Sequence, residues 1–240
     1  MKPLLSLSIV SHRQAELIRP LLANLACCGL ADFEVLLTIN LPEDESAYAD
    51  HPFPVRIIRN PVPKGFGANH NAAFAASAGR WFVIVNPDIR IDALDVAALL
   101  APFDDPSTGA VAPTILSVRG TVEDSVRRFP TLGRLSRRVL LRQREPDYTW
   151  QREPISVDWV AGMFVVFRRE AFEQVSGFDD KRFFMYFEDV DICARLAQRG
   201  WTIRLQPQVA VVHDAQRDSH RNWRHLRWHL VSALRYLIGL

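Results

Sequence analysis

The 240-residue sequence has few cysteines, little net charge and no long apolar run. Its three cysteines include an adjacent pair, Cys27 and Cys28, and show neither a disulfide framework nor metal-ligand spacing. This usage suits a reducing compartment, so we expect a cytoplasmic protein. A net charge of +2 is too small to indicate a nucleic-acid partner. The chain also has no apolar run long enough to span a bilayer, no internal repeat and no low-complexity tract.

The apolar content, in contrast, is typical of a globular protein with a full core. Hydrophobic residues make up 48% of a chain whose length suits one domain, or one domain with an appended helix. No small-residue cleavage pattern follows the N-terminal apolar run Leu4–Val10. We therefore expect a first strand there and not a signal peptide.

Strand and helix patterns alternate along the first half of the chain. Apolar runs predict strands, and apolar residues at helical spacing predict the helices between them. The predicted strands are 5–10, 34–39, 55–59 and 81–85, with helices at 15–26 and 66–78. Later strand-like runs lie at 110–116, 163–167, 202–205 and 209–212, with helices at 94–100, at 168–175 and in a segment that ends near 200. The alternation predicts an α/β fold with a parallel sheet.

Polar residues follow three of the predicted strands. Ser11 and His12 end the first strand, Asn40 ends the second, and Asn86-Pro87-Asp88 ends the fourth. Ligands of parallel α/β sheets bind beyond the carboxyl ends of the strands. The convergence of these residues is therefore a site hypothesis in itself.

The segment Lys64-Gly65-Phe66-Gly67, followed by Asn69, lies where a strand should turn into a helix. Glycines let the backbone approach a phosphate, and a helix N-terminus favours its negative charge. An ordinary glycine-containing helix start is the alternative. The segment alone does not separate the two interpretations.

Asp88 and His213 are candidate metal ligands. Asp88 directly follows an apolar strand, where an acid can hold a divalent cation that bridges a diphosphate. Asn86-Pro87-Asp88 is equally good turn chemistry. A histidine at a strand end such as His213 is more often structural, but together with Asp88 it becomes a candidate ligand.

The aromatic run Phe183–Phe187 leads directly into three carboxylates in four positions, Glu188, Asp189 and Asp191. Carboxylates set against apolar side chains lose hydration, which raises their pKa and makes them better bases. The alternative is a helix cap, but capping needs one acid and not three. Asp191 lies about 200° around the helix from Asp189, so we expect Asp189 to face the site and Asp191 to be structural.

Arginine is concentrated in two segments, 126–144 and 217–235. The arginines of the first segment could face phosphate or membrane, or could belong to a solvated loop. In the second segment, the predicted helix 222–240 carries leucines, Trp223 and Ile238 near one side, with basic residues around it. Such a helix suits a membrane surface, and packing on the core is the alternative.

Taken together, these motifs resemble the inverting, metal-dependent family 2 glycosyltransferases of the GT-A fold, most of all bacterial rhamnosyltransferase-like members. The resemblance covers nearly the whole chain. It rests on ordered motifs at 60–69, 82–88, 162–169 and 177–191, followed by His213. It implies a GT-A domain over 1–218, with a Rossmann-like, mostly parallel central sheet flanked by helices, and an amphipathic helix over 219–240.

The resemblance implies a role for each candidate residue. Asp88 and His213 would hold Mg²⁺ or Mn²⁺ on the nucleotide diphosphate, and Asp189, beside Glu188, would activate the acceptor hydroxyl. Residues expected to contact the nucleotide-sugar are Ser11, His12, Asn40, Lys64, Gly65, Phe66, Asn69, Asn86 and Asp88. Residues expected near the acceptor or donor sugar are Asp158, Trp159 and Gly162.

Two departures from the family pattern affect the donor site. Asn86 replaces the first acid of the usual Asp-x-Asp motif, so Asp88 would be the one carboxylate of the motif left to hold the metal. Ile39-Asn40 stands where many relatives have Asp-Asn, which leaves the base and ribose contacts, and the identity of the nucleotide, open.

The implied activity is inverting sugar transfer from a nucleotide-diphosphate donor, with dTDP-rhamnose a candidate, to a saccharide or polyprenyl-linked acceptor of the cell surface. The enzyme would lie in the cytoplasm, at the inner face of the membrane if the C-terminal helix binds lipid. One alternative is a sugar nucleotidyltransferase, which would release pyrophosphate. Another is a non-catalytic nucleotide-binding or membrane-scaffold protein, against which the complete acidic cluster counts.

Overall fold

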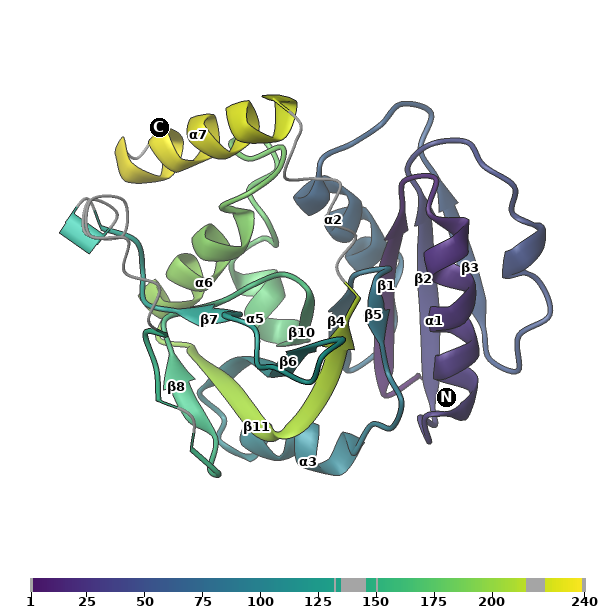
Figure 1. The fold of residues 1–240 in the computed structure, drawn as a ribbon, viewed down its shortest axis with the longest axis horizontal. Coiled ribbons are helices and arrows are strands. Elements are labelled where there is room, and N and C mark those ends of the chain that lie inside the picture. The colour runs from purple at the N-terminus through teal and green to yellow at the C-terminus, as the bar shows by residue number, and fades with distance from the viewer. Residues whose placement is uncertain (1, 132, 135–145, 150, 215–222, 239–240) are drawn as a thin grey trace.

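The computed structural model describes residues 2–131, 133–134, 146–149, 151–214 and 223–238 (Figure 1). Within these residues a large sheet has the strand order β3-β2-β1-β4-β10-β6-β11-β5, and β8 pairs with β11 off this path. Its strands are β1 (Leu5–Ser11), β2 (Phe33–Ile39), β3 (Val55–Arg59), β4 (Trp81–Val85), β5 (Ile89–Arg90), β6 (Thr108–Ser117), β8 (Ile155–Val157), β10 (Phe164–Arg168) and β11 (Thr202–His213). A separate two-stranded sheet pairs β7 (Val126–Arg127) with β9 (Trp159–Val160).

Most strands of the large sheet run in one direction. β2 is parallel to β1 and β3, β1 is parallel to β4, and β6 is parallel to β11. β10 interrupts this pattern, since it runs antiparallel between β4 and β6, and the short strands β5 and β8 run antiparallel to β11. All five residues of β4 are buried, as expected for a parallel strand covered on both faces. The prediction of an α/β fold with a mostly parallel central sheet is confirmed.

Helices cover both faces of this sheet. The helices are α1 (Ala15–Cys27), α2 (Phe66–Ala76), α3 (Val96–Leu100), α5 (Arg169–Gln174), α6 (Glu188–Gln198) and α7 (Trp223–Ile238), with short 3-10 helices at Ser46–Tyr48 and Ala101–Asp104. α1 packs Ile18 and Leu22 into one core, and α5 and α6 pack Phe172 and Leu196 into the other. Successive residues of β4 alternate between the two cores, so the sheet is the shared middle layer.

The observed elements differ from the predicted ones mainly in the second half of the chain. One strand of 12 residues, β11, replaces two predicted strands, because its pairing with β6 shifts between Gln206 and Ala210 without ending. The short strands β5, β7, β8 and β9 were not predicted, since two or three residues carry no readable periodicity. Much of the predicted basic, irregular stretch, including 135–145, lies outside the described residues.

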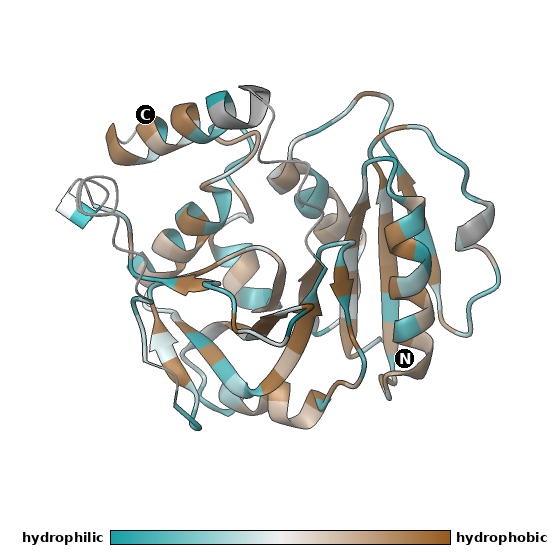
Figure 2. Ribbon diagram, in the orientation of Figure 1, coloured by the Kyte–Doolittle hydropathy of each residue, from teal (hydrophilic) through white to brown (hydrophobic). Residues whose placement is uncertain are grey.

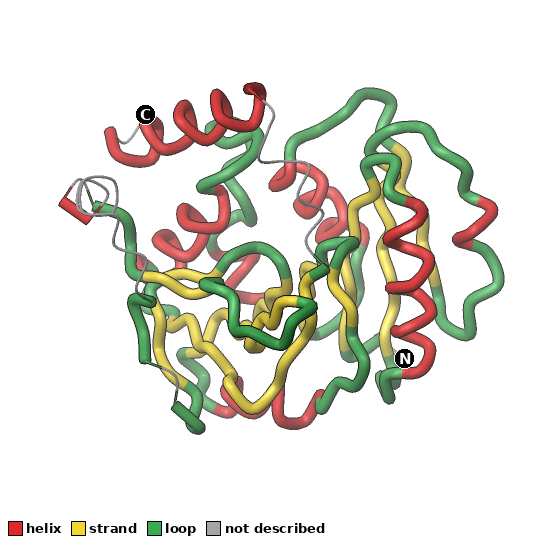
Figure 3. Tube along the Cα trace, viewed as in Figure 1, coloured by secondary structure: helices red, strands yellow, loops and turns green. Residues whose placement is uncertain are grey.

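α7 lies beyond the sheet, over the segment Phe183–Phe187, which we call the aromatic loop (Figures 1 and 3). Phe183 and Phe187 are buried and form a third core with Val190, against which Ala233 and Tyr236 of α7 pack. One face of the predicted C-terminal helix therefore packs on the rest of the domain.

The opposite face of α7 is apolar and exposed, as the hydrophobic colouring along the helix illustrates (Figure 2). Leu230, Leu234 and Ile238 are exposed by 60%, 57% and 53%. None of the described helices combines the length and the apolar content needed to cross a bilayer. The two interpretations of this helix are thus compatible, because they concern different faces.

Candidate active site

A cavity of about 650 Å³ lies at the carboxyl ends of β1, β2 and β4, and we call it the strand-end cavity. Seven of the residues predicted to contact the nucleotide-sugar line it, namely His12, Asn40, Lys64, Phe66, Asn69, Asn86 and Asp88. Ser11 and Gly65 are not among its described lining residues. Ser11 is buried, and its hydroxyl accepts a hydrogen bond from the Gln14 N–H (3.2 Å), so it fixes the turn after β1.

A cluster of asparagines holds the loop that carries Lys64. Buried Asn40 accepts from the Lys64 N–H (2.8 Å) and donates to the Lys64 carbonyl (3.0 Å). Asn60 donates to Asn40 (2.9 Å) and to Asn69 (2.6 Å). The cluster therefore ties the end of β2 to the start of α2 and keeps exposed Lys64 at the rim of the cavity.

Gly65 lets the aromatic loop touch the start of α2. The Phe66 N–H donates to the Phe184 carbonyl (3.0 Å). A Cβ at Gly65 would lie 2.3 Å from that oxygen, and a Cβ at Gly67 would lie 2.7 Å from Phe178 Cβ. Both glycines are therefore needed for close packing between segments that are far apart in the sequence.

Asp88 and His213 lie side by side. His213 Nε2 is 3.2 Å from Asp88 Oδ2, and His213 Nδ1 is 2.8 Å from Glu123 Oε2. The hydrogen bond to Asp88, followed by that to Glu123, raises the pKa of His213 to about 9. The remaining oxygen of Asp88, Oδ1, is buried and has no hydrogen-bond partner among the described residues.

This donor set fits a divalent cation. The described residues contain no group of three His, Cys, Asp or Glu side chains placed to bind one ion. Asp88 and His213 could supply two ligands, and a hard cation on a diphosphate takes the others from phosphate and water. Glu123 would orient His213 through Nδ1, a role that carboxylates commonly have behind metal-bound histidines.

The aromatic loop separates the strand-end cavity from a second cavity. Tyr186 and Phe187 have φ angles of 70° and 67°, in the left-handed region that bulky residues rarely adopt. Phe184 and Met185 line the strand-end cavity, whereas Tyr186 and Phe187 line the second one. The chain thus passes from one cavity to the other between Met185 and Tyr186, next to the strained backbone of Tyr186 and Phe187.

The second cavity, of about 250 Å³, lies at the N-terminus of α6, and we call it the α6 cavity. Its described lining residues are Arg127, Arg128, Pro130, Arg134, Asp147, Trp159, Tyr186, Phe187, Glu188, Asp189, Val190 and His229. Trp159, Glu188 and Asp189 are predicted site residues. Gly162 is outside the lining, but its N–H donates to Asp189 Oδ2 (3.3 Å).

Asp158 has a different place from the one expected for a sugar contact. It is not among the described lining residues of either cavity. Its carboxylate accepts from the Phe129 N–H (2.7 Å) and from the Tyr148 hydroxyl (2.9 Å). Asp158 therefore fixes the segment around Arg128, which lines the α6 cavity.

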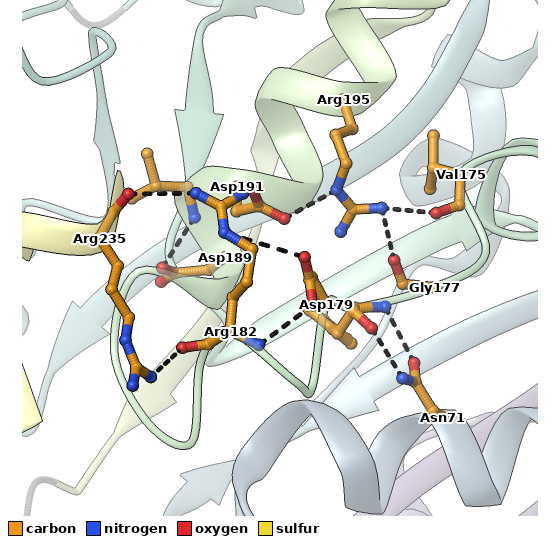
Figure 4. Close-up of polar contacts among 11 residues, drawn as sticks. Asn71, Val175, Gly177, Asp179, Arg182, Asp189, Asp191, Arg195 and Arg235 are labelled. Atoms are coloured by element: carbon orange, nitrogen blue, oxygen red, sulfur yellow. Dashed lines mark hydrogen bonds and ion pairs between the residues drawn. The ribbon is translucent and has the colours of Figure 1, made fainter. Parts of the chain in front are cut away.

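Asp191 has the structural place expected for it. Arg195 Nε lies 2.7 Å from Asp191 Oδ2, and Arg182 Nη1 lies 3.4 Å from Asp191 Oδ1. Figure 4 shows these arginines around Asp191, with Asp189 outside the network. Arg182 Nη2 also donates to the Arg235 carbonyl and Arg235 Nη1 donates to the Arg182 carbonyl, so the network joins α6 to α7.

Glu188 and Asp189 differ in what compensates their burial. Glu188 is 6% exposed, its Oε2 has no hydrogen-bond partner among the described residues, and burial together with the Asp189 charge raises its pKa to about 8. Burial also raises the pKa of Asp189, but hydrogen bonds from the Val190 and Gly162 N–H groups oppose this shift. Both carboxyl groups therefore have a raised pKa, and Asp189 is the one whose carboxylate accepts backbone hydrogen bonds at the α6 cavity.

α7 contributes adjacent residues to the two cavities. The ring of Trp228 lies 5.1 Å from Phe184 in the strand-end cavity, and the ring of His229 lies 5.3 Å from Tyr186 in the α6 cavity. Ser232 donates to the Met185 carbonyl (2.9 Å), which fixes α7 on the aromatic loop. Sequence reasoning did not assign His229 or Glu123 to the site, because each is brought there only by tertiary packing.

Comparison with known proteins agrees with this arrangement. The family described as "Glycosyl transferase family 2" matches residues 6–176. An N-acetylglucosaminyl-diphospho-decaprenol L-rhamnosyltransferase of Mycobacterium tuberculosis is 30% identical, over 92% of this chain and 80% of that protein. Rhamnosyltransferase WbbL of Escherichia coli K12 is also 30% identical, over 95% of this chain and 90% of its own length.

Solved structures share the fold at lower identity. GalNAc-T7 with UDP, GalNAc and Mn²⁺ has a TM-score of 0.68 at 14% identity, over 89% of this chain and 44% of that chain. Mannosyltransferase PcManGT from Pyrobaculum calidifontis, in complex with GDP-Man and Mn²⁺, has a TM-score of 0.64 at 20% identity, over 98% and 65%. The present chain thus spans less than two thirds of each of these solved chains.

Glu188→Gln should flatten part of the pH dependence of thermal stability. The folded-state pKa of Glu188 is raised from 4.5 to about 8. The contribution of its protonated form to the free energy of unfolding is therefore fully present below pH 4.5 and is lost as the pH rises toward 8. Glutamine does not ionise, so the Tm of the variant should gain on that of the wild type between pH 5 and 8. Calorimetry across this range tests the difference, with Glu170→Gln on exposed α5 surface as control. A Tm difference that stays constant with pH would contradict the assignment.

Proposed function

Because the chain belongs to glycosyl transferase family 2, and is therefore a glycosyltransferase that moves a sugar to an acceptor, we propose that it acts with inversion on a nucleotide-diphosphate sugar. The donor would bind in the strand-end cavity and the acceptor in the α6 cavity. The first donor to test is dTDP-rhamnose, since two of the relatives named above are rhamnosyltransferases.

The observation that carries this proposal is the position of Asp189 in the α6 cavity, next to Gly162. Asp189 lines the α6 cavity, and its carboxylate is bonded to the Gly162 N–H. A Cβ at Gly162 would lie 3.0 Å from Phe66 Cζ and 3.8 Å from Asp189 Cβ, and Phe66 lines the strand-end cavity. A hydroxyl held near Asp189 would therefore be close to the place where the two cavities approach each other.

The reaction would be one in-line displacement. Asp189 takes the proton of the acceptor hydroxyl while the hydroxyl oxygen forms a bond to the anomeric carbon. The bond from that carbon to the diphosphate oxygen breaks, and its electron pair leaves with the diphosphate. Lys64, at the rim of the strand-end cavity, would face the negative charge of the departing group. Attack from the face opposite the leaving group inverts the anomeric centre.

We further propose that Asp88 and His213 hold a divalent cation, Mg²⁺ or Mn²⁺, on the donor diphosphate. The buried Oδ1 of Asp88, which has no hydrogen-bond partner among the described residues, and the Glu123 carboxylate behind His213 support this assignment. Such a cation would stabilise the charge that develops on the diphosphate. Asn86 supplies no second carboxylate, so Asp88 would be the single acidic ligand from β4 and its following turn.

The acceptor in this proposal is linked to a polyprenyl diphosphate, and the enzyme would lie in the cytoplasm at the inner face of the membrane. The name of the mycobacterial relative includes a diphospho-decaprenol acceptor. The exposed apolar face of α7, with exposed Arg227 beside it, suits adsorption to an anionic lipid surface. The same helix lines both cavities, so adsorption there would bring the site close to its lipid-linked substrate.

Asp189→Asn should abolish most transfer and leave donor binding intact. Loss of a general base typically costs about 10²–10⁴ in rate. Glu188→Gln should lose less, because Glu188 is already protonated at neutral pH. Turnover and donor affinity should be measured on the same purified variants. Near-normal turnover of Asp189→Asn would refute its role as the base, and loss of donor affinity would move Asp189 to the metal site.

Donor binding should depend on a divalent metal through Asp88. Excess chelator should stop transfer, and Mg²⁺ or Mn²⁺ should restore it. Calorimetric titration of the nucleotide diphosphate should show that Asp88→Ala weakens binding when Mn²⁺ is present and has little effect in chelator. Asp92→Ala, an exposed acid four residues later, is the matched control. Full transfer activity in excess chelator would exclude the metal site.

Replacing the exposed face of α7 should release the protein from lipid. Leu230→Ser, Leu234→Ser and Ile238→Ser together remove apolar area without touching the packed face, so binding to anionic vesicles should fall by more than about tenfold. Vesicle sedimentation measures this loss. The double variant Val118→Ser/Val122→Ser, at exposed apolar positions far along the chain from α7, should bind like the wild type. Equal sedimentation of the α7 variant and the wild type would show that this face does not contact membrane.

A further inference from the structure

The α6 cavity has two chemically different walls. Glu188 and Asp189 lie at the start of α6, and Arg127, Arg128 and Arg134 come from the segment that follows β6. Deprotonation of an acceptor requires Asp189 only. The donor diphosphate is assigned to the strand-end cavity, on the other side of the aromatic loop. The function proposed above therefore leaves the arginines unused.

The structure fixes the backbone that carries these arginines. The Arg128 N–H donates to Asp147 Oδ2 (3.0 Å), and the Arg128 carbonyl accepts from Trp159 Nε1 (3.0 Å). The next N–H, of Phe129, donates to Asp158 Oδ2 (2.7 Å), and Asp158 is itself held by Tyr148. The segment is thus anchored to β9 and to Tyr148 by hydrogen bonds that do not use the guanidinium groups.

Among the described residues, the guanidinium groups make few polar contacts. Arg127 contacts Asp124 Oδ2 through Nε (2.9 Å) and Nη2 (2.8 Å) and lies over the Trp159 ring, and Arg134 Nη1 donates to the Phe129 carbonyl (3.0 Å). The Arg128 guanidinium lies over the Tyr148 ring, 5.6 Å from its centre. A guanidinium carries five N–H donors, more than these contacts use, and its planar fork matches phosphate oxygens.

We infer that Arg128 and Arg134, with Arg127 beside them, form a subsite for the diphosphate of the acceptor. This inference rests on the proposed function, because it assumes that the acceptor enters the α6 cavity. A sugar linked to that diphosphate would then lie between the arginines and Asp189, with its hydroxyl toward the base. Trp159 and Tyr186 in the same cavity would offer ring faces to the sugar. The chemistry recognised is a diphosphate esterified to the acceptor sugar at one end and to a lipid at the other, and the exposed apolar face of α7 favours this lipid-linked source over a free anion.

Binding of farnesyl diphosphate tests the subsite without knowledge of the sugar. Titration is done on the full chain in excess chelator, so that no cation can recruit the probe to Asp88. Loss of one charge-assisted contact should raise the Kd about tenfold or more for Arg128→Gln and for Arg134→Gln. Arg119→Gln, an exposed arginine in the turn after β6, removes the same charge and should bind like the wild type.

Two comparison ligands identify what the subsite recognises. Farnesol should bind at least about tenfold more weakly than farnesyl diphosphate and should not distinguish the arginine variants from the wild type. Inorganic pyrophosphate should bind more weakly than farnesyl diphosphate but with the same sensitivity to the variants. Equal affinity for pyrophosphate and farnesyl diphosphate would overturn the lipid-linked source. Variants that bind farnesyl diphosphate like Arg119→Gln would overturn the subsite.

Donor turnover separates failure of the subsite from failure of the proposed function. Hydrolysis of the nucleotide-sugar by the wild type in the absence of acceptor reports on the proposed function, whereas the Kd of the donor depends on the strand-end cavity and should be the same in Arg128→Gln, Arg134→Gln and the wild type. If the wild type hydrolyses the nucleotide-sugar but the arginine substitutions do not change the affinity for farnesyl diphosphate, the subsite alone is refuted. Absence of turnover with every nucleotide-sugar tested would refute the proposed function, whatever the diphosphate titration shows.

Discussion

Burial of charge at the first turn of α6 is the constraint on which the site depends. Asp191 is compensated by Arg195 and Arg182, and Glu188 is compensated by holding a proton. Asp189 is left with two backbone N–H donors to its carboxylate, beside a cavity. An unpaired buried charge destabilises the folded state, so each acid needs a compensating partner or a proton. Three neighbouring carboxylates thereby acquire three different chemical characters.

The aromatic loop supplies the apolar surroundings that this arrangement needs. Phe183 and Phe187 are buried in the third core, and the strained backbone at Tyr186 and Phe187 persists because that core holds it. Contact of the Phe184 carbonyl with the start of α2, permitted by Gly65, fixes the other side of the loop. The loop is thus anchored to α2, α6 and α7, and its residues line the strand-end cavity on one side and the α6 cavity on the other.

The sequence allowed prediction of the parts that depend on local pattern. Alternating apolar runs predicted the parallel strands of the first half, and polar residues at their ends predicted most of the strand-end cavity lining. The irregular pairing inside β11 could not be read locally, because it is a property of two paired strands. Glu123 could not be predicted as a site residue either, because only the folded chain brings it to His213. Asp158 was expected near a sugar, but its carboxylate accepts hydrogen bonds from the Phe129 N–H and the Tyr148 hydroxyl, and no pattern in one sequence distinguishes a ligand contact from such support.

Adjacent residues of α7 line different cavities, and this has a thermodynamic consequence. Trp228 borders the strand-end cavity and His229 borders the α6 cavity, on one rigid helix. A ligand that binds more tightly when α7 is packed on the aromatic loop stabilises this packed state. The packed state then also favours binding in the other cavity. Linkage then requires the effect to be reciprocal, so donor and acceptor would raise each other's affinity by the same factor. Such coupling would favour the ternary complex over either binary one, with a single helix as the coupling element.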